Sequence, residues 1–146
     1  MSLQDWLKFG WLKDHRTSRR EIADLFAVAD RDLKACSTPA LVPDWQFNIA
    51  YNAALQLATA ALAAAGYEAE RANHHHRAIQ SLEFTVGLEA ATITKFDVFR
   101  KMRNITDYER ADTISDTEAK EMRELAESLR AKVEAWVRKN HPRFVL

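Results

Sequence analysis

The residues best placed to do chemistry in this chain lie between positions 100 and 108. An α-helix over this segment separates its side chains into two faces. One face is apolar. The other carries two guanidinium groups, an amide, a carboxylate and a phenol, from Arg100, Arg103, Asn104, Asp107 and Tyr108. Arginines bind anions, and a nearby carboxylate fixes their orientation. The pattern indicates an anion-binding face, although similar faces on other helices are simply solvated.

Three residue pairs on this face are four positions apart, the spacing at which helical side chains are neighbours. The pairs are Arg100 with Asn104, Arg103 with Asp107, and Asn104 with Tyr108. The spacing therefore predicts one connected polar cluster.

A second candidate is the run of three histidines, His74, His75 and His76. Adjacent side chains on a helix point about 100° apart, so three in a row do not chelate one metal ion. No histidine or carboxylate follows at positions 77–80, where a helical partner ligand would stand. The spacing favours no metal site. It predicts instead a capping and packing role, with one imidazole turned inward.

The elements that must position these residues are helical. Only three glycines and three prolines occur among 146 residues, and the chain is rich in Ala, Leu, Glu, Arg and Lys. We expect one domain over residues 1–146, all-α, built as an antiparallel four-helix bundle over about 18–140 with additional short helices. No strand pattern is visible. The expected helices cover residues 3–13, 18–35, 44–65, 73–86, 92 or 94 to 108, and 115–140.

Several residues mark where these helices begin and end. Ser18 with Glu21, and Ser115 with Glu118, have the spacing of capping boxes. Asp44 is expected to cap the next helix, and Gly66 is a natural residue to end it.

Composition limits the function and the location. Lys plus Arg and Asp plus Glu are both 21, so the net charge is zero. This argues against coating nucleic acid by bulk electrostatics, but leaves room for a local basic patch. The single cysteine, Cys36, excludes an intrachain disulfide and is expected to be a buried or incidental thiol. Without a secretory signal or an apolar run of spanning length, we expect a cytoplasmic protein away from membranes.

The sequence Arg-x-x-Arg-Asn-x-x-x-Tyr, on the penultimate long helix of an all-helical chain, resembles the HEPN superfamily. It looks most like its small stand-alone or nucleotidyltransferase-associated members. The matching residues are Arg100, Arg103, Asn104 and Tyr108, with Asp107 before the tyrosine. A second match is a segment of the form His-His-x-x-x-Ile-x-x-Leu, carried by His75, His76, Ile79 and Leu82.

The resemblance implies a homodimer in which the motif helices of both subunits line a shared cleft. In the RNase members an arginine is followed, after four to six residues, by a histidine. Here Tyr108 stands at that place, with four residues between it and Arg103. A phenol with an ordinary pKa of about 10 is a poor base at neutral pH. His76 is a candidate to replace the missing histidine.

Three functions follow as hypotheses. The first is a nucleotide- or RNA-binding protein without a cofactor, as part of a toxin–antitoxin or nucleotidyltransferase pair. Its arginines would bind phosphate, Asn104 and Asp107 would position them, and Tyr108 would contact base or ribose. The second is a metal-independent endoribonuclease using Arg103, Tyr108 and His76. The third is a structural interaction module, in which the polar face is a salt-bridge network and the segment 3–13, with two tryptophans, is a docking element.

Overall fold

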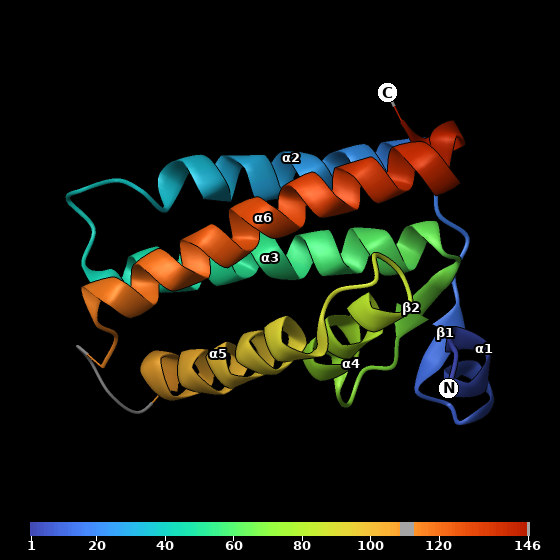
Figure 1. Ribbon diagram of the computed structural model, residues 1–146, viewed down its shortest axis with the longest axis horizontal. Helices are drawn as coiled ribbons and strands as arrows, with labels where there is room; N and C mark the ends of the chain where they lie inside the picture. Colours follow the sequence, from blue (N-terminus) through green and yellow to red (C-terminus); the bar gives the residue numbers. More distant parts are fainter. Residues whose placement is uncertain (109–112, 146) are drawn as a thin grey trace.

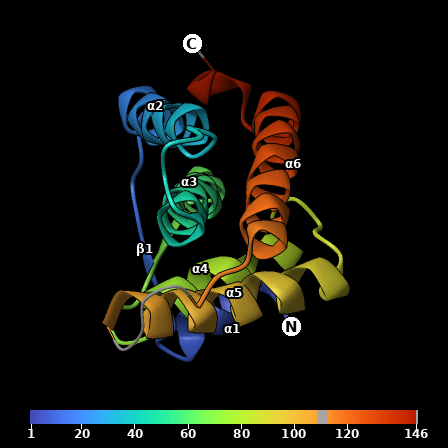
Figure 2. The same ribbon diagram turned by 90° about the vertical axis from the view of Figure 1, so that its left-hand side faces the viewer.

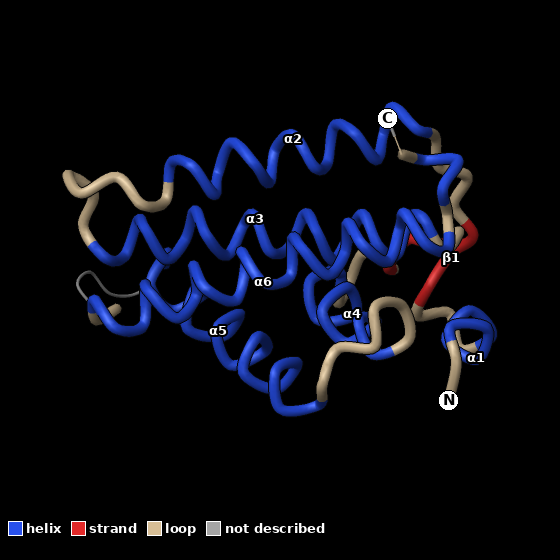
Figure 3. The backbone as a smooth tube through the Cα atoms, turned by 45° about the horizontal axis from the view of Figure 1, so that its top comes forward, coloured by secondary structure: helices blue, strands red, loops and turns tan. Residues whose placement is uncertain are grey.

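A computed structural model gives the fold of this chain and describes residues 1–108 and 113–145, with side chains described for 1–104 and 113–145. The described chain is mainly helical, as predicted from composition, but it also contains one short two-stranded sheet (Figures 1 and 3). The elements, in chain order, are α1 (Leu3–Lys8), β1 (Leu12–Asp14), α2 (Arg19–Ala35), α3 (Pro43–Ala64), β2 (Tyr67–Ala69), α4 (His74–Gln80), a 3-10 turn (Ser81–Glu83), α5 (Ala90–Tyr108), α6 (Asp116–Asn140) and a second 3-10 turn (Pro142–Phe144).

Helix α3 forms the centre of the hydrophobic core. Most of its side chains are buried, including Phe47, Leu57 and Ala58, each with no exposed surface. Its many alanines keep the helix narrow, so that neighbouring helices can approach closely. The helix ends before Gly66, which adopts φ +100°, a left-handed conformation that glycine accepts without strain.

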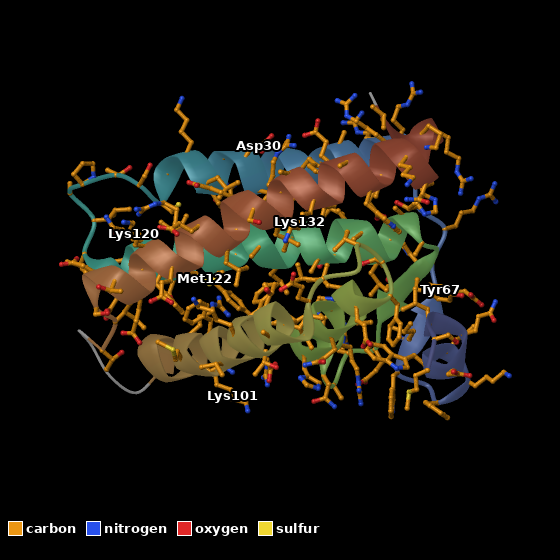
Figure 4. The ribbon with its side chains drawn as sticks, viewed as in Figure 1. Asp30, Tyr67, Lys101, Lys120, Met122 and Lys132 are labelled. Carbon is orange, nitrogen blue, oxygen red and sulfur yellow. The ribbon has the colours of Figure 1, made fainter. Side chains whose placement is uncertain are left out.

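The other long helices are arranged around α3. Helices α2 and α6 lie beside it, and α4 and α5 cover its opposite side (Figure 2). In Figure 1, α2 and α5 run from right to left, whereas α3 and α6 run from left to right. Met122 of α6 is fully buried, while Lys101, on the outer side of α5, is largely exposed (Figure 4).

The amino-terminal segment differs from the helix expected over residues 3–13. Helix α1 ends at Lys8, and the chain turns at Gly10, where φ is +78°. It then forms β1, which pairs antiparallel with β2 so that Leu12 lies opposite Ala69. A positive φ interrupts a helix, and the sheet supplies the backbone with other hydrogen-bond partners. The prediction of a single helix is therefore wrong beyond Lys8, and so is the absence of strands.

Other helix boundaries also depart from expectation. The helix expected over 73–86 is α4, which gives way to a 3-10 turn after Gln80, and α5 begins at Ala90. Asp44 does not cap α3, which begins at Pro43. Its Oδ1 instead accepts a hydrogen bond from the buried backbone N–H of Ile114, at 3.2 Å.

The predicted capping boxes have different outcomes. The box of Ser115 and Glu118 is confirmed at the start of α6, which ends at Asn140 as expected. Ser18 accepts a hydrogen bond from the backbone of Glu21, as predicted. The Glu21 carboxylate, however, accepts from Thr17 and contacts His15 instead of closing the box.

Candidate functional site

The candidate site is an open pocket of about 780 Å³ where α4, α5 and the two strands meet. Helices α4 and α5 lie side by side in Figures 1 and 2. The pocket is lined mainly by basic and imidazole side chains, with Glu68 the carboxylate among them. Its lining comprises Lys13, Glu68, Ala69, Arg71, Ala72, Asn73, His74, His75, His76, Arg100 and Asn104. A net excess of positive charge therefore surrounds a cavity of a size suited to a small ligand.

The sheet brings a lysine to this pocket from the far end of the sequence. Lys13 of β1 pairs directly with Glu68 of β2, and both line the pocket. The guanidinium carbon of Arg77, on α4, lies 3.8 Å from the centre of the Trp11 ring. This stack helps to hold the amino-terminal segment against α4, with Trp6 buried in the same small cluster. The tryptophans thus pack on the domain itself.

Asp97, on α5, connects the two helices that line the pocket. Its Oδ1 accepts a hydrogen bond from Nε of Arg100 at 2.8 Å and lies 3.1 Å from Nδ1 of His76. Lys101 Nζ lies 3.9 Å from the other carboxylate oxygen. Burial acts to raise the pKa of Asp97, but the hydrogen bonds and charges of Arg100 and His76 outweigh it, so the pKa is lowered. Asp97 is therefore an ionised acceptor at neutral pH.

His75 is held from the opposite side, by the core. Its Nδ1 lies 3.3 Å from the phenol oxygen of Tyr51, a residue of α3 with no exposed surface. Burial raises the pKa of Tyr51 well above its usual range, so the phenol keeps its proton. Burial also lowers the pKa of His75, with the charges of His74, Arg103 and Arg100 adding to the effect. The neutral phenol therefore donates to a neutral imidazole, and we assign the His75 proton to Nε2.

The predicted arginine face is divided in the structure. Arg100 and Asn104 line the pocket, as does His76. Arg103 does not; its guanidinium carbon lies 5.2 Å from the centre of the Tyr51 ring. The Arg103 guanidinium therefore makes a cation–π contact with Tyr51, and this contact helps to fix the phenol ring from the side of α5. The side chains of Asp107 and Tyr108 lie outside the described residues.

Some residues of this site were missed by sequence reasoning. Asp97 carried a local signal, because it stands three positions before Arg100 and so lies on the same helical face. Tyr51 stands on an alanine-rich apolar helix, where nothing in the sequence marks it as part of a site. Lys13 and Arg71 had no signal, because an unpredicted sheet and loop place them.

One of the three histidines turns inward, as the spacing indicated, but the expected capping role is not seen, because α4 begins after Asn73 with no side-chain cap hydrogen bond. His74 is exposed, His75 turns toward Tyr51 in the core, and His76 reaches Asp97. Across the described part of the chain, no group of three or more His, Cys, Asp or Glu residues is placed to hold a metal ion. Cys36 is fully buried at the end of α2, as predicted, and burial raises the pKa of its thiol.

In comparisons with known proteins, no family model and no curated protein sequence matches this chain. Among the helices of residues 1–108 and 113–145, none combines the length and apolarity needed to cross a membrane.

Proposed function

We propose that this chain is a HEPN-like protein that binds RNA or a nucleotide through phosphate groups in the pocket between α4 and α5. The observation that carries this proposal is the clustering of Lys13, Arg71 and Arg100 around one cavity in a chain of zero net charge. Concentrating cations at one place in a neutral protein favours a localised anionic ligand over a long nucleic-acid track.

The chemistry of the lining supports a phosphate ligand. The Nε of Arg100 is bound by Asp97, which orients the guanidinium while its terminal nitrogens stay available for phosphate oxygens. Asn104 adds an exposed amide one helical turn away, and His75 adds an imidazole N–H. A volume of about 780 Å³ falls in the range of small-molecule sites and exceeds what a single phosphate needs. Space therefore remains for a ribose and a base.

The resemblance to HEPN proteins adds expectations that extend this proposal. They are an antiparallel four-helix bundle formed by α2, α3, α5 and α6, a homodimer, a cytoplasmic location, and a place in a toxin–antitoxin or nucleotidyltransferase pair. The alternating directions of these four helices in Figure 1 support the bundle. Within the proposal, Arg103 supports the site through Tyr51, and Arg100 is the arginine that contacts phosphate.

Binding of fluorescent short single-stranded RNA, and of ATP or GTP, tests the proposal. We expect Arg100→Ala to weaken binding about tenfold, because a charge-assisted hydrogen bond to phosphate is lost and the Asp97 carboxylate is left at the pocket. Arg71→Ala, which removes an exposed pocket cation, should weaken binding less. The variant should also reduce the slope of log binding constant against log salt concentration by about one.

Arg138→Ala is the matched control, because Arg138 also pairs with a carboxylate on its own helix but lies on α6 away from the pocket. Equal affinity in the Arg100, Arg71 and Arg138 variants would contradict the proposal. That result would favour the third hypothesis, in which the polar face of α5 is a structural salt-bridge network.

A further inference from the structure

A second concave surface lies between α2 and α6, and it shares no lining residue with the pocket between α4 and α5. We propose that this surface, the α2–α6 groove, binds an acidic, amphipathic helix of a partner protein. The inference does not rest on the proposed function, because neither the residues nor the ligand chemistry are the same.

The α2–α6 groove follows from how the long helices pack. Helices α2 and α6 both lie along α3 but contact each other much less, so a furrow is left between them (Figure 2). Its volume of about 290 Å³ is at the low end of small-molecule sites, which span roughly 300–1,000 Å³. The groove therefore suits a few apolar side chains of a partner better than a whole small-molecule ligand. Its apolar lining includes Ile22, Ala23, Phe26, Ala27, Val137 and Phe144.

An ion pair between the two helices holds the groove at a fixed width. Arg130 of α6 donates from Nε and Nη2 to the two carboxylate oxygens of Asp30 on α2, at 2.8 and 3.2 Å. Arg130 also pairs with Glu134 on its own helix, and its guanidinium carbon lies 5.0 Å from the centre of the Phe26 ring. A bidentate pair of this kind fixes geometry as well as adding energy. A partner thus meets a preformed surface and loses less free energy in ordering it.

The end of the groove where α2 begins and α6 ends is basic (Figure 1). Arg138, which lines the groove, is already paired with Glu134 at 3.0 Å. Four further basic side chains at this end are exposed and make no ion pair within the described ranges 1–104 and 113–145. They are Arg16, Arg19, Lys139 and Arg143. The carboxylate of Asp14 offsets at most one of these charges.

The basic end is continuous with the apolar groove. Phe144 lines the groove and also lines the neighbouring cavity, which it shares with Arg16 and Arg143. The guanidinium carbon of Arg143 lies 4.6 Å from the centre of the Phe144 ring. A surplus of cations beside an apolar floor favours a partner whose apolar stripe is flanked by carboxylates.

The shape of the groove selects a helix as the occupant. Its walls are helices, whose backbone groups bond within the helix, so recognition depends on side chains and not on strand addition. Its floor is recessed, with Ile22 2% and Val137 3% exposed. A helix projects side chains at positions i, i+3, i+4 and i+7 into such a groove, whereas a flat lipid surface does not reach the floor. A second copy docked groove to groove would bring like charges together.

The test measures binding of fluorescein-labelled helical peptides to the full-length protein by fluorescence anisotropy. The acidic probe carries leucines at i, i+3, i+4 and i+7 and glutamates on its other faces, and the matched basic probe has lysine in place of every glutamate. We expect the acidic probe to bind about tenfold more tightly than the basic one, with an affinity that falls as salt is added. Arg143→Gln should weaken this binding several-fold, mainly by slowing association.

A substitution in the groove wall tests where the peptide binds. Ala27 is exposed and lines the groove, so Ala27→Glu should fold normally and weaken binding of the acidic probe by about tenfold. Ala91→Glu is the matched control, because it adds the same charge at an exposed position of α5 outside the groove. This control should bind the probe as the wild type does, and circular dichroism checks the fold of both variants.

The outcomes separate this inference from the proposed function and from other occupants. Ala27→Glu should leave RNA and nucleotide binding unchanged, and Arg100→Ala should leave peptide binding unchanged. Absence of binding by the acidic probe, equal binding of the two probes, or equal binding by the wild type and Ala27→Glu would overturn the inference. Tighter binding to vesicles of phosphatidylcholine and phosphatidylserine than to the peptide would assign the surface to a membrane and overturn it as well. So would a wild-type dimer that Ala27→Glu dissociates, because the groove would then hold a second copy.

Discussion

The phenol of Tyr51 lies 3.3 Å from Nδ1 of His75, which joins the centre of the hydrophobic core to the lining of the pocket. Tyr51 belongs to α3 and His75 to the first turn of α4. Because the phenol is a neutral donor, it fixes which nitrogen of His75 carries a proton. A core residue thus determines what kind of hydrogen bond the pocket offers to a ligand.

Replacing Tyr51 with phenylalanine tests this connection. Tyr51→Phe keeps the ring packed against Phe96 and under Arg103 but removes the donor to His75. We expect the free energy of unfolding to fall by about 1 kcal/mol, the usual contribution of one hydrogen bond. Ligand affinity should fall as well, because the His75 proton is no longer held on Nε2. Urea unfolding and nitrogen NMR of the imidazole measure the two effects, and an unchanged tautomer would contradict the assignment.

The stability of the chain should fall as the pH is lowered below neutrality. Burial lowers the pKa of His75, and it does the same for His141, where Arg143 adds to the effect. The unfolded chain takes up protons at these histidines near their ordinary pKa of about 6.5, before the folded chain does. Their contribution is therefore complete above that pH and is lost as the pH falls through it.

Urea unfolding at pH 7.5 and pH 5.5 measures this loss. The drop should be smaller in His75→Gln and in His141→Gln than in the wild type. Arg20→Gln is the control, because its side chain is 91% exposed and is not among the charges that act on either histidine. Asp97 acts in a separate and lower window, because its lowered pKa gives stability that is lost only as the pH falls below about 4. An equal drop in all four proteins would show that these histidines do not carry the effect.

The close packing around α3 predicts the cost of a larger side chain. Ala58 has no exposed surface and lies in the main core. We expect Ala58→Leu to lower the free energy of unfolding by about 1–3 kcal/mol, because extra methylene groups must displace neighbouring helices or adopt strained rotamers. Ala131→Leu, on the exposed side of α6, should leave stability nearly unchanged. Thermal and urea unfolding should show a clearly lower stability for Ala58→Leu than for Ala131→Leu. Equal stabilities would mean that the core around Ala58 can accommodate a leucine side chain.

The stack of Arg77 on Trp11 predicts how firmly the amino-terminal segment is held. Arg77→Ala should lower the free energy of unfolding by about 1 kcal/mol and shift tryptophan emission toward the red, because the ring loses its cover. Arg20→Ala is the control, since the Arg20 side chain is 91% exposed. Unchanged emission in Arg77→Ala would show that the segment is anchored by Trp6 and the sheet instead.

The sequence by itself determined that the chain is mainly helical and where several of its helices begin and end. The capping box at Ser115 and the helix end at Gly66 could be predicted because they depend on residues within a few positions of one another. The shared side of Arg100 and Asn104 follows from the same local geometry. The tertiary structure alone decided that Arg103 packs on Tyr51, that His76 meets Asp97, and that Lys13 joins the pocket through an unpredicted sheet. These contacts join residues at least 21 positions apart, and no helical period relates such distant side chains.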